Sequence, residues 1–200
     1  MVDWAARYQE GHTPWDLGGP HPELAARLDR RDPDLIRSPD TPARALVPGC
    51  GRGHDALALA EAGWRVTALD IVPALAPELA PALEKQGGRF QVGDALAYQA
   101  DPPFDLLFEH TFFCALAPAK RPIYGHMAQR ILRPGGRLAA IVFPIGREPK
   151  SDGPPYSMTV EDLSAALGSG FRLLENRPVA HPGKGRAWPE VWADFERLDS

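Results

Sequence analysis

Apolar runs of strand length alternate with helical stretches along most of the chain. The runs predict strands at Ala43–Pro48, Arg65–Asp70, Arg89–Val92, Phe104–His110, Gly136–Phe143, Phe171–Pro178 and Arg186–Leu198. Alternation of this kind is typical of a parallel sheet covered by helices. The last two strands are joined by the turn-forming HPGKGR and are expected to be antiparallel. The pattern therefore predicts an α/β fold with a doubly wound, mostly parallel seven-stranded sheet.

The segments between these strands carry helix signals. The stretch DALALAEAG, Asp55–Gly63, predicts a short helix closed by glycine. After the second strand, prolines recur every fourth residue, and each one removes a helical hydrogen bond, so we expect a short or kinked helix there. Pro118 is expected to open the next helix, which would end at the RPGG of residues 133–136, ahead of the fifth strand. Thr159 is expected to cap the start of a further helix.

The first forty residues have a different pattern. They contain Trp4, Tyr8 and Trp15 and the turn-forming GGPHP of residues 18–22. Aromatic residues ahead of a sheet either pack on its outside or cover a site at its carboxyl edge, and the pattern alone leaves both open. We predict one domain, with a helical or lid segment at residues 1–40 and an α/β core at residues 41–200.

Composition narrows the function classes. A net charge of −4 gives no basic footprint for nucleic acid, which argues against an enzyme that acts on DNA or large RNA. The longest apolar run, Leu138–Ile145, is too short to span a bilayer, and the opening MVDWAARYQEG predicts no secretion signal. Cys50 and Cys114 make neither a disulfide framework nor a metal cluster, and we interpret them as small buried side chains. We expect a cytoplasmic monomer with a small-molecule partner, without nucleic acid or membrane.

Three glycines follow the first predicted strand at a spacing of two. They are Gly49, Gly51 and Gly53, in the stretch ALVPGCGRGHD of residues 45–55. In a doubly wound sheet, ligands bind outside the carboxyl ends of the strands, so these glycines indicate a close approach of ligand and backbone. The dinucleotide fingerprint G-x-G-x-x-G needs its third glycine where this chain has His54. The match to a nicotinamide or flavin site is therefore imperfect.

Two aspartates extend the pattern to the next strands. Asp70 ends the second strand, where a carboxylate accepts hydrogen bonds from both ribose hydroxyls. Asp94 follows the third strand, where it can accept a hydrogen bond from an adenine amino group beside the backbone of Ala95. The sequence has no P-loop lysine to hold a triphosphate. Together, the glycines and the two aspartates indicate an adenosine-containing ligand.

The chain resembles a known family in VPGCGRGHD, VTALDI, GDAL, FDLLFEHTFFCAL, LRPGGRLAAIVFP and GPPYSMT. These motifs resemble class I S-adenosylmethionine-dependent methyltransferases. More narrowly, they resemble the thiopurine S-methyltransferase family and its thiol and halide methyltransferase branch. The glycine loop and RPGG mark the broad class, whereas TPWDLGGPHPEL, FFCAL and GPPY are the specific part. The resemblance extends from Trp4 to about Leu167 and implies a Rossmann-like fold, an N-terminal lid and S-adenosylmethionine as cofactor.

The resemblance also implies a set of cofactor-binding residues. The aromatic members would cover the sulfonium, because a cation near a ring face is favoured by about 0.5–2 kcal/mol. The glycines would meet the methionine part, and the aspartates the ribose and the adenine. His110 stands where the branch often has tyrosine and the thiopurine enzymes have arginine. The full set is Trp4, Tyr8, Trp15, Gly49, Gly51, Asp70, Asp94, Ala95 and His110.

On the acceptor side, Phe112, Phe113 and Tyr156 would form an apolar, polarisable pocket for sulfur, selenium or iodide, although the two phenylalanines also suit a plain core. Methyl transfer mainly requires alignment of the reacting atoms. A thiol with a pKa of about 8.5 needs only modest help to ionise, so a dedicated base is not required. The candidate bases are Glu109, His110 and Tyr156.

Three other readings of the residues stay open. An NAD(P)-dependent oxidoreductase of Rossmann type would share the sheet, the glycines and Asp70. A non-catalytic module that binds an adenosine cofactor would share all the cofactor residues. A methyltransferase acting on a small oxygen or nitrogen nucleophile would share the pocket residues as well.

Overall fold

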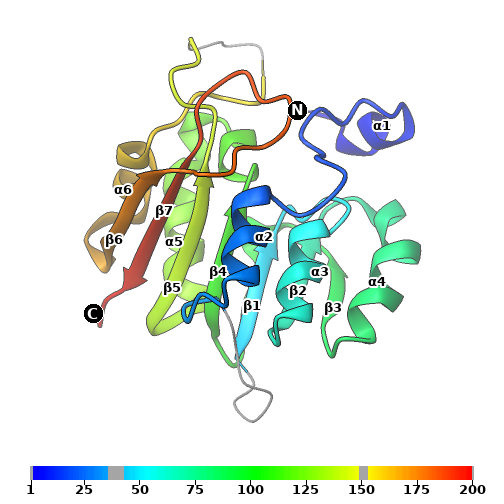
Figure 1. Cartoon of the computed structure of the whole chain (residues 1–200), viewed down its shortest axis with the longest axis horizontal. Helices are drawn as coiled ribbons and strands as arrows, with labels where there is room; N and C mark the ends of the chain where they lie inside the picture. Colours follow the sequence, from blue (N-terminus) through cyan, green and yellow to red (C-terminus); the bar gives the residue numbers. More distant parts are fainter. Residues whose placement is uncertain (1, 36–42, 149–152, 200) are drawn as a thin grey trace. The chain divides into compact units, whose positions relative to one another are not determined.

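The computed structural model describes residues 2–35, 43–148 and 153–199. Its strands are β1 (Arg44–Pro48), β2 (Arg65–Asp70), β3 (Arg89–Val92), β4 (Phe104–His110), β5 (Leu132–Val142), β6 (Phe171–Pro178) and β7 (Val191–Arg197). They form a seven-stranded sheet in the order β3-β2-β1-β4-β5-β7-β6 (Figure 1). The predicted α/β fold with a seven-stranded, mostly parallel sheet is confirmed.

The chain divides into two compact units, Met1–Ala95 and Leu96–Ser200. The expectation of a single domain stays a prediction, and its boundary between residues 40 and 41 falls outside the described residues. In the part of the chain that the structure describes, we find no helix with the length and hydrophobicity needed to cross a membrane.

In the first unit, β1, β2 and β3 run parallel, so their carboxyl ends share one edge. β1 and β2 are buried along almost their whole length, as expected for parallel strands covered on both faces. α3 packs on β1 and β2, and α4 packs on β3. α1 lies beyond the carboxyl ends of these strands (Figure 1). The helices of this unit are α1 (Trp4–Gln9), α2 (Pro22–Asp29), α3 (His54–Glu61), η1 (Pro73–Leu75) and α4 (Ala76–Glu84), and η2 (Ala95–Ala97) begins at its end.

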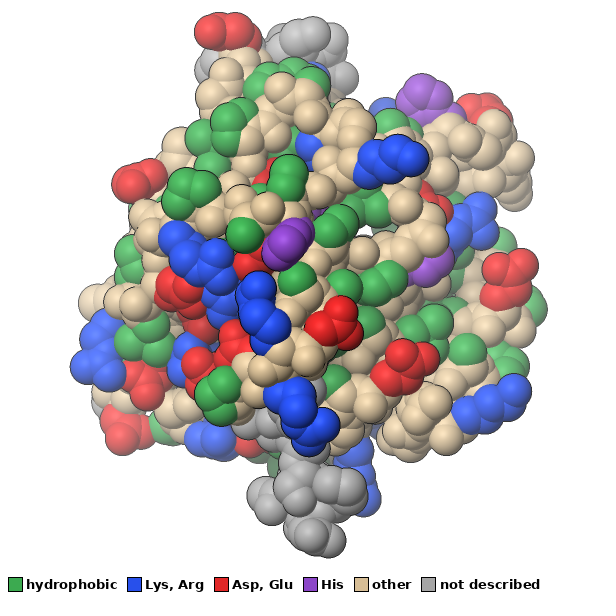
Figure 2. Space-filling model, viewed as in Figure 1, with side chains coloured by type: hydrophobic (Ala, Val, Ile, Leu, Met, Phe, Trp, Pro, Cys, Tyr) green, Lys and Arg blue, Asp and Glu red, His purple; other side chains and the backbone are tan. Residues whose placement is uncertain are grey.

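In the second unit, β4 and β5 are parallel, while β7 runs antiparallel to both β5 and β6. The expected antiparallel pairing of the last two strands is confirmed. α5 and α6 pack on each other beside these strands (Figure 1). On the face shown in Figure 2, Lys and Arg side chains are interspersed with Asp and Glu over the region of β6 and β7. The helices are η3 (Phe113–Ala115), η4 (Pro118–Lys120), α5 (Arg121–Ile131), α6 (Val160–Leu167) and η5 (Gly168–Gly170).

Most predicted boundaries agree with the structure. β2, β3, β4 and β6 have the predicted limits, and β1 begins one residue later than expected. The proline-rich segment splits into η1 and the nine-residue α4, with Pro81 inside the helix. Pro118 opens η4, which leads into α5. Thr159 caps α6 in a capping box, in which its side chain accepts from the Asp162 N–H and the Asp162 carboxylate accepts from the Thr159 N–H.

Two predicted boundaries are wrong. RPGG does not separate α5 from β5, because β5 begins at Leu132 and RPGG interrupts its register: Phe104 pairs with Leu132, and Leu106 pairs with Arg137. Arg133 holds this bulge to β4, since its Nε donates to Asp105 Oδ1 over 2.6 Å. The seventh strand begins at Val191 instead of residue 186, so HPGKGR belongs to a longer connection rather than a tight hairpin.

Candidate active site

The glycine loop connects β1 to α3 at the carboxyl edge of the first unit. Gly49, Gly51 and Gly53 all have positive φ, at 57°, 55° and 77°, a region that favours glycine. A Cβ on Gly51 would lie 2.7 Å from the Tyr8 hydroxyl oxygen, and one on Gly53 would lie 2.3 Å from a Leu79 methyl carbon. Gly51 therefore makes room for the N-terminal segment. Gly53 allows close packing against α4, a role like that of the third fingerprint glycine.

Asp70 is the last residue of β2 and only 8% exposed. Its Oδ2 accepts a hydrogen bond from the Gly51 N–H over 2.9 Å, and its Oδ1 accepts one from the Val72 N–H over 3.0 Å. Burial raises the pKa of this carboxyl, and the backbone N–H groups oppose the rise. The Ile71 N–H also interacts with this carboxyl. An ionised carboxylate has about four acceptor sites, so it retains capacity for a hydroxyl donor beside these backbone groups.

Trp4, Tyr8 and Trp15 form an aromatic cluster. The ring centroids of Trp4 and Trp15 are 5.3 Å apart, those of Tyr8 and Trp15 are 5.7 Å apart, and both pairs meet edge to face. The Trp15 indole Nε1–H donates to the Tyr8 hydroxyl over 3.2 Å. The Arg7 guanidinium carbon lies 5.5 Å from the Trp4 ring centroid and 5.8 Å from that of Trp15. These rings thus already attract one cation, as tryptophan faces do.

Tyr8 brings the aromatic cluster against the glycine loop, because its hydroxyl occupies the space left open at Gly51. Burial raises the pKa of Tyr8 to about 12, and the charge of Asp70 adds to the rise. The hydroxyl therefore stays neutral at physiological pH. It can approach the Asp70 carboxylate without charge repulsion.

Further contacts connect the N-terminal segment to the glycine loop. The Asp16 carboxylate lies 3.0 Å from Arg52 Nε and 3.3 Å from His54 Nε2. The His21 N–H donates to Asp55 Oδ1 over 2.7 Å. We call these contacts, together with the approach of the Tyr8 hydroxyl to Gly51, the N-terminal clasp. His54, which departs from the dinucleotide fingerprint, is part of this clasp.

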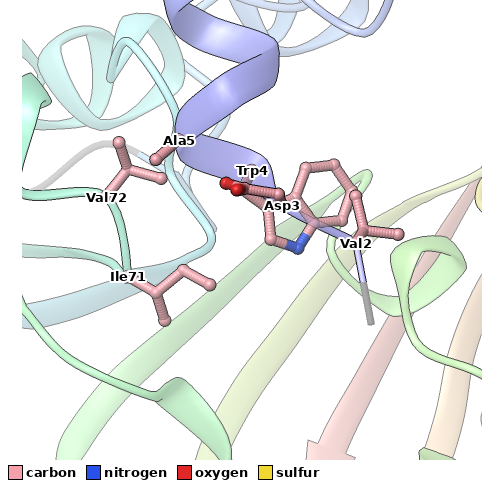
Figure 3. Close-up of a pocket in the computed structure, with 6 residues that line it drawn as sticks. All are labelled: Val2, Asp3, Trp4, Ala5, Ile71 and Val72. Atoms are coloured by element: carbon pink, nitrogen blue, oxygen red, sulfur yellow. The ribbon is translucent and has the colours of Figure 1, made fainter.

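A hollow of about 350 Å³ opens between the start of α1 and the chain that follows β2. Figure 3 shows Trp4 on one side of it and Ile71 and Val72 on the other. Sites for small molecules range from about 300 to 1,000 Å³. Two of the residues that line the hollow, Ile71 and Val72, directly follow Asp70 in the chain, although Asp70 itself does not line the hollow. Its lining residues are Val2, Asp3, Trp4, Ala5, Ile71 and Val72.

The adenine candidates lie at the end of the neighbouring strand. Asp94 is exposed two residues after β3, and Ala95 is buried at the start of η2. The Gly93 N–H donates to the backbone oxygen of Asp70 over 2.9 Å, which holds this segment beside the end of β2. All the cofactor candidates except His110 therefore belong to the first unit.

In the second unit, Glu109 and His110 end β4. Glu109 is 1% exposed, and its Oε1 accepts hydrogen bonds from the N–H groups of both Phe112 and Phe113, each over 2.9 Å. Burial raises the pKa of Glu109 to about 7, although the two N–H groups lower it. The Tyr124 hydroxyl also interacts with the carboxyl group, but among the described residues neither it nor Oε2 has a hydrogen bond of normal geometry.

FFCAL and GPPY are distant in sequence but lie side by side. The Tyr156 N–H donates to the Cys114 backbone oxygen over 2.7 Å. Arg121 supports the same junction, because its Nη2 donates to the Ser157 oxygen over 2.6 Å and its guanidinium carbon lies 4.9 Å from the Phe113 ring centroid. Phe113 is fully buried, which favours the core alternative for it, whereas Phe112 and Tyr156 are partly exposed.

Cys114 is buried, as interpreted from the sequence, whereas Cys50 is partly exposed. Burial raises the pKa of Cys114 to about 12 and raises that of Cys50 well above its usual value. Negative carboxylates add to both shifts, from Glu109 at Cys114 and from Asp70 at Cys50. Both thiols therefore stay protonated at neutral pH.

The sequence analysis missed Arg186. Its Nη2 lies 3.1 Å from His110 Nε2, and its guanidinium carbon lies 4.1 Å from the Phe143 ring centroid. Its side chain is only 6% exposed and lies 3.6 Å from the carboxylate of Glu190, which in turn accepts the Gly183 N–H over 2.6 Å. The only sequence signal, an arginine among turn-forming residues, is common on surfaces, and the wrong strand boundary at residue 186 hid it further.

The buried carboxyl of Glu109 should make stability depend on pH. Its folded-state pKa of about 7 exceeds the ordinary value of 4.5, so between these values the folded protein binds more protons than the unfolded chain. The free energy of unfolding of the unmodified protein should therefore fall across this window, relative to Glu109→Gln, by on the order of 3 kcal/mol. Denaturant unfolding of both proteins from about pH 4.5 to pH 8 measures this difference. Parallel pH profiles would contradict it.

A family model described as thiopurine S-methyltransferase matches residues 1–194. A probable thiol methyltransferase 2 of Arabidopsis thaliana is 34% identical over 191 residues, covering 91% of this chain and 80% of that protein. Thiocyanate methyltransferase 1 of the same plant is 33% identical over 189 residues, covering 90% of this chain and 78% of that protein.

Among solved structures, the chain is similar to the 1,6-didemethyltoxoflavin-N1-methyltransferase of Burkholderia thailandensis, determined with S-adenosylhomocysteine bound. The TM-score is 0.76 at 24% identity, and the match covers 98% of this chain and 86% of the other. At this identity, the likeness establishes the fold alone. This similarity in fold agrees with the seven-stranded sheet described above.

Proposed function

Because this chain belongs to the thiopurine S-methyltransferase family and is an S-adenosylmethionine-dependent methyltransferase, we propose that it methylates a small, soft nucleophile. A thiol is the first candidate, and a halide or a metalloid is the second. Family membership confirms the resemblance seen in the motifs and disfavours both the oxidoreductase and the non-catalytic module. The cytoplasmic location, the monomeric state and the absence of a nucleic-acid partner stay predictions from the sequence.

The cofactor side of the proposal rests on Asp70. We assign its carboxylate to the ribose hydroxyls, since it keeps acceptor sites beyond those used by Gly51 and Val72. The hollow beside Trp4 and Ile71 lies at the segment that follows Asp70 and is large enough for part of a small molecule. The other proposed contacts are Gly49 and Gly51 to the methionine part, Asp94 and Ala95 to the adenine, Trp4, Tyr8 and Trp15 over the sulfonium, and His110.

The acceptor side of the proposal rests on the surroundings of His110. The Arg186 guanidinium beside this histidine would donate hydrogen bonds to an anionic nucleophile, although the buried Glu190 carboxylate, 3.6 Å from its Nε, offsets part of its charge. Phe112 and Tyr156, on the adjacent FFCAL and GPPY segments, add polarisable walls. Relatives named as thiol and thiocyanate methyltransferases support a sulfur acceptor.

The proposed reaction is an in-line displacement. S-adenosylmethionine supplies an electrophilic methyl group on a sulfonium sulfur. The thiolate sulfur forms a bond to the methyl carbon as the bond from that carbon to the sulfonium breaks, and the thiol proton has left for solvent beforehand. The residues of this chain then have to orient the acceptor and exclude water, and orientation alone lowers a barrier by several kcal/mol.

The pH dependence of two acceptors tests this proposal. Only the thiolate form of a thiol reacts well, so kcat/KM for a small thiol should rise towards the pKa of that thiol. Iodide has no proton to lose and should show no such rise on the same preparation, which makes it the matched control. Methylation of an amine or a phenol, with neither thiol nor iodide accepted, would overturn the proposed acceptor class.

We also propose that residues 2–20 form a lid. α1 has no buried residue, and the ion pair of Asp16 with Arg52 is partly exposed, so it stabilises the closed position by only about 0–1 kcal/mol. Such contacts can open to admit substrate and close again. Closure would place the aromatic cluster over the reaction and keep water away from the reactive methyl group.

Limited proteolysis tests the lid, because chymotrypsin cleaves after the aromatic residues that form the cluster. S-adenosylhomocysteine should slow cleavage at Trp4, Tyr8 and Trp15. Asp16→Asn should speed cleavage at these residues in the free protein, because it weakens the pairs with Arg52 and His54. Asp29→Asn, at an exposed position in α2, is the control. Equal cleavage rates with and without ligand would mean that the aromatic residues are purely structural.

A further inference from the structure

The turn after β4 has an unusual backbone. Thr111 has φ 65°, a left-handed conformation that a β-branched residue seldom adopts. The next two backbone N–H groups, of Phe112 and Phe113, converge on one atom, Oε1 of Glu109. The carboxylate thus stabilises a conformation that the local sequence does not favour.

Within the proposed function, we infer that Glu109 is a positioning residue that holds the turn of residues 111–114, and not the general base. A general base must reach the proton that it removes. The Glu109 side chain is 1% exposed, and its Oε1 already accepts the Phe112 and Phe113 N–H groups. Its position therefore suits support of the turn rather than contact with a substrate.

The turn matters because it carries both sides of the proposed acceptor pocket. Phe112 belongs to it directly, and the Cys114 backbone oxygen accepts the Tyr156 N–H. Arg121 adds a second support, through its contacts with the Phe113 ring and the Ser157 oxygen. A shift of the turn would therefore move Phe112 and Tyr156 together.

Charged and titratable groups surround the Glu109 carboxyl on several elements. His110 follows it on β4, Tyr124 approaches it from α5, and Cys114 approaches it from η3. Arg121 and Arg186 act on Cys114 in turn. A pH profile alone would mix these titrations, so the test compares acceptors and variants at one pH.

The roles of general base and of positioning residue predict different effects of Glu109 on kcat/KM for a thiol and for iodide. A general base helps only the thiol, whereas a positioning residue helps both acceptors equally. Glu109→Gln keeps an oxygen that can accept both N–H groups, so it should retain kcat/KM for both acceptors within about threefold. Glu109→Ala should lower both by a similar factor of about 10–100, because small misplacements of reacting groups have effects of this size. Glu196→Gln, in an exposed pair with Arg172, is the matched control.

Two further readouts separate this role from general damage and from failure of the proposed function. Amide hydrogen exchange at Phe112 and Phe113 should be slow in the unmodified protein and in Glu109→Gln, and fast in Glu109→Ala. If the alanine variant does not fold, the activity and amide exchange of the glutamine variant alone decide between the positioning role and the general-base role. Affinity for S-adenosylhomocysteine should change less than the two activities, because His110 is the one proposed cofactor contact within residues 109–124, where the contacts of Glu109 lie.

The inference is overturned if both variants lose thiol methylation while iodide methylation is unchanged, which is the pattern of a base. It is also overturned if Glu109→Ala retains both activities and slow exchange. If the unmodified protein accepts neither thiol nor iodide, the proposed function fails, and the exchange rates still decide the positioning role.

Discussion

The hydrogen bonds from the Gly51 and Val72 N–H groups to the Asp70 carboxylate are the contacts on which the proposed cofactor site depends. They connect the glycine loop to the end of β2, so one side chain fixes the course of two adjacent turns. Because Gly51 has no Cβ, the Tyr8 hydroxyl can then occupy the space above it. That position brings the aromatic cluster against the glycine loop.

Buried carboxylates perform the same physical task at other loops. Glu109 accepts two backbone N–H groups after β4, and Glu190 accepts the Gly183 N–H ahead of β7. Burial of a charge is costly unless hydrogen bonds compensate it, and bonds to an ionised acceptor are the stronger kind. Side chains of strands and their flanks thereby hold irregular backbone in position. The proposed functional residues lie on that backbone.

The sequence predicts regular elements better than it predicts contacts between loops. β2 and β4 have their predicted limits, since apolar runs define them locally, and the mostly exposed β3 and β6 have theirs as well. RPGG was assigned wrongly because a long-range contact, from Arg133 to Asp105, holds it as a bulge in β5. Residues 186–190 were assigned wrongly because a side-chain contact within the connection, from the Gly183 N–H to Glu190, shapes a loop there. The glycines and Asp70 could be recognised by their order along the chain.

Other parts of the candidate site have no local signal. Asp16 and His54 are far apart in sequence, and nothing near either residue predicts their pairing. Arg186 looks like a surface residue until the fold places it against Phe143 and His110. The two hydrogen bonds from backbone N–H groups to Glu109 likewise depend on the left-handed conformation of Thr111. No sequence rule predicts that conformation for a threonine.

The affinity of Asp70→Ala for S-adenosylhomocysteine, measured by calorimetry, tests the central claim most directly. Loss of the carboxylate removes the proposed ribose acceptors and releases the Gly51 and Val72 N–H groups. The expected loss of binding free energy is about 1–3 kcal/mol. Asp70→Asn, which keeps one oxygen, should lose less, and Asp29→Ala at the exposed end of α2 should bind as the unmodified protein does. Unchanged affinity in a folded Asp70→Ala protein would contradict the account.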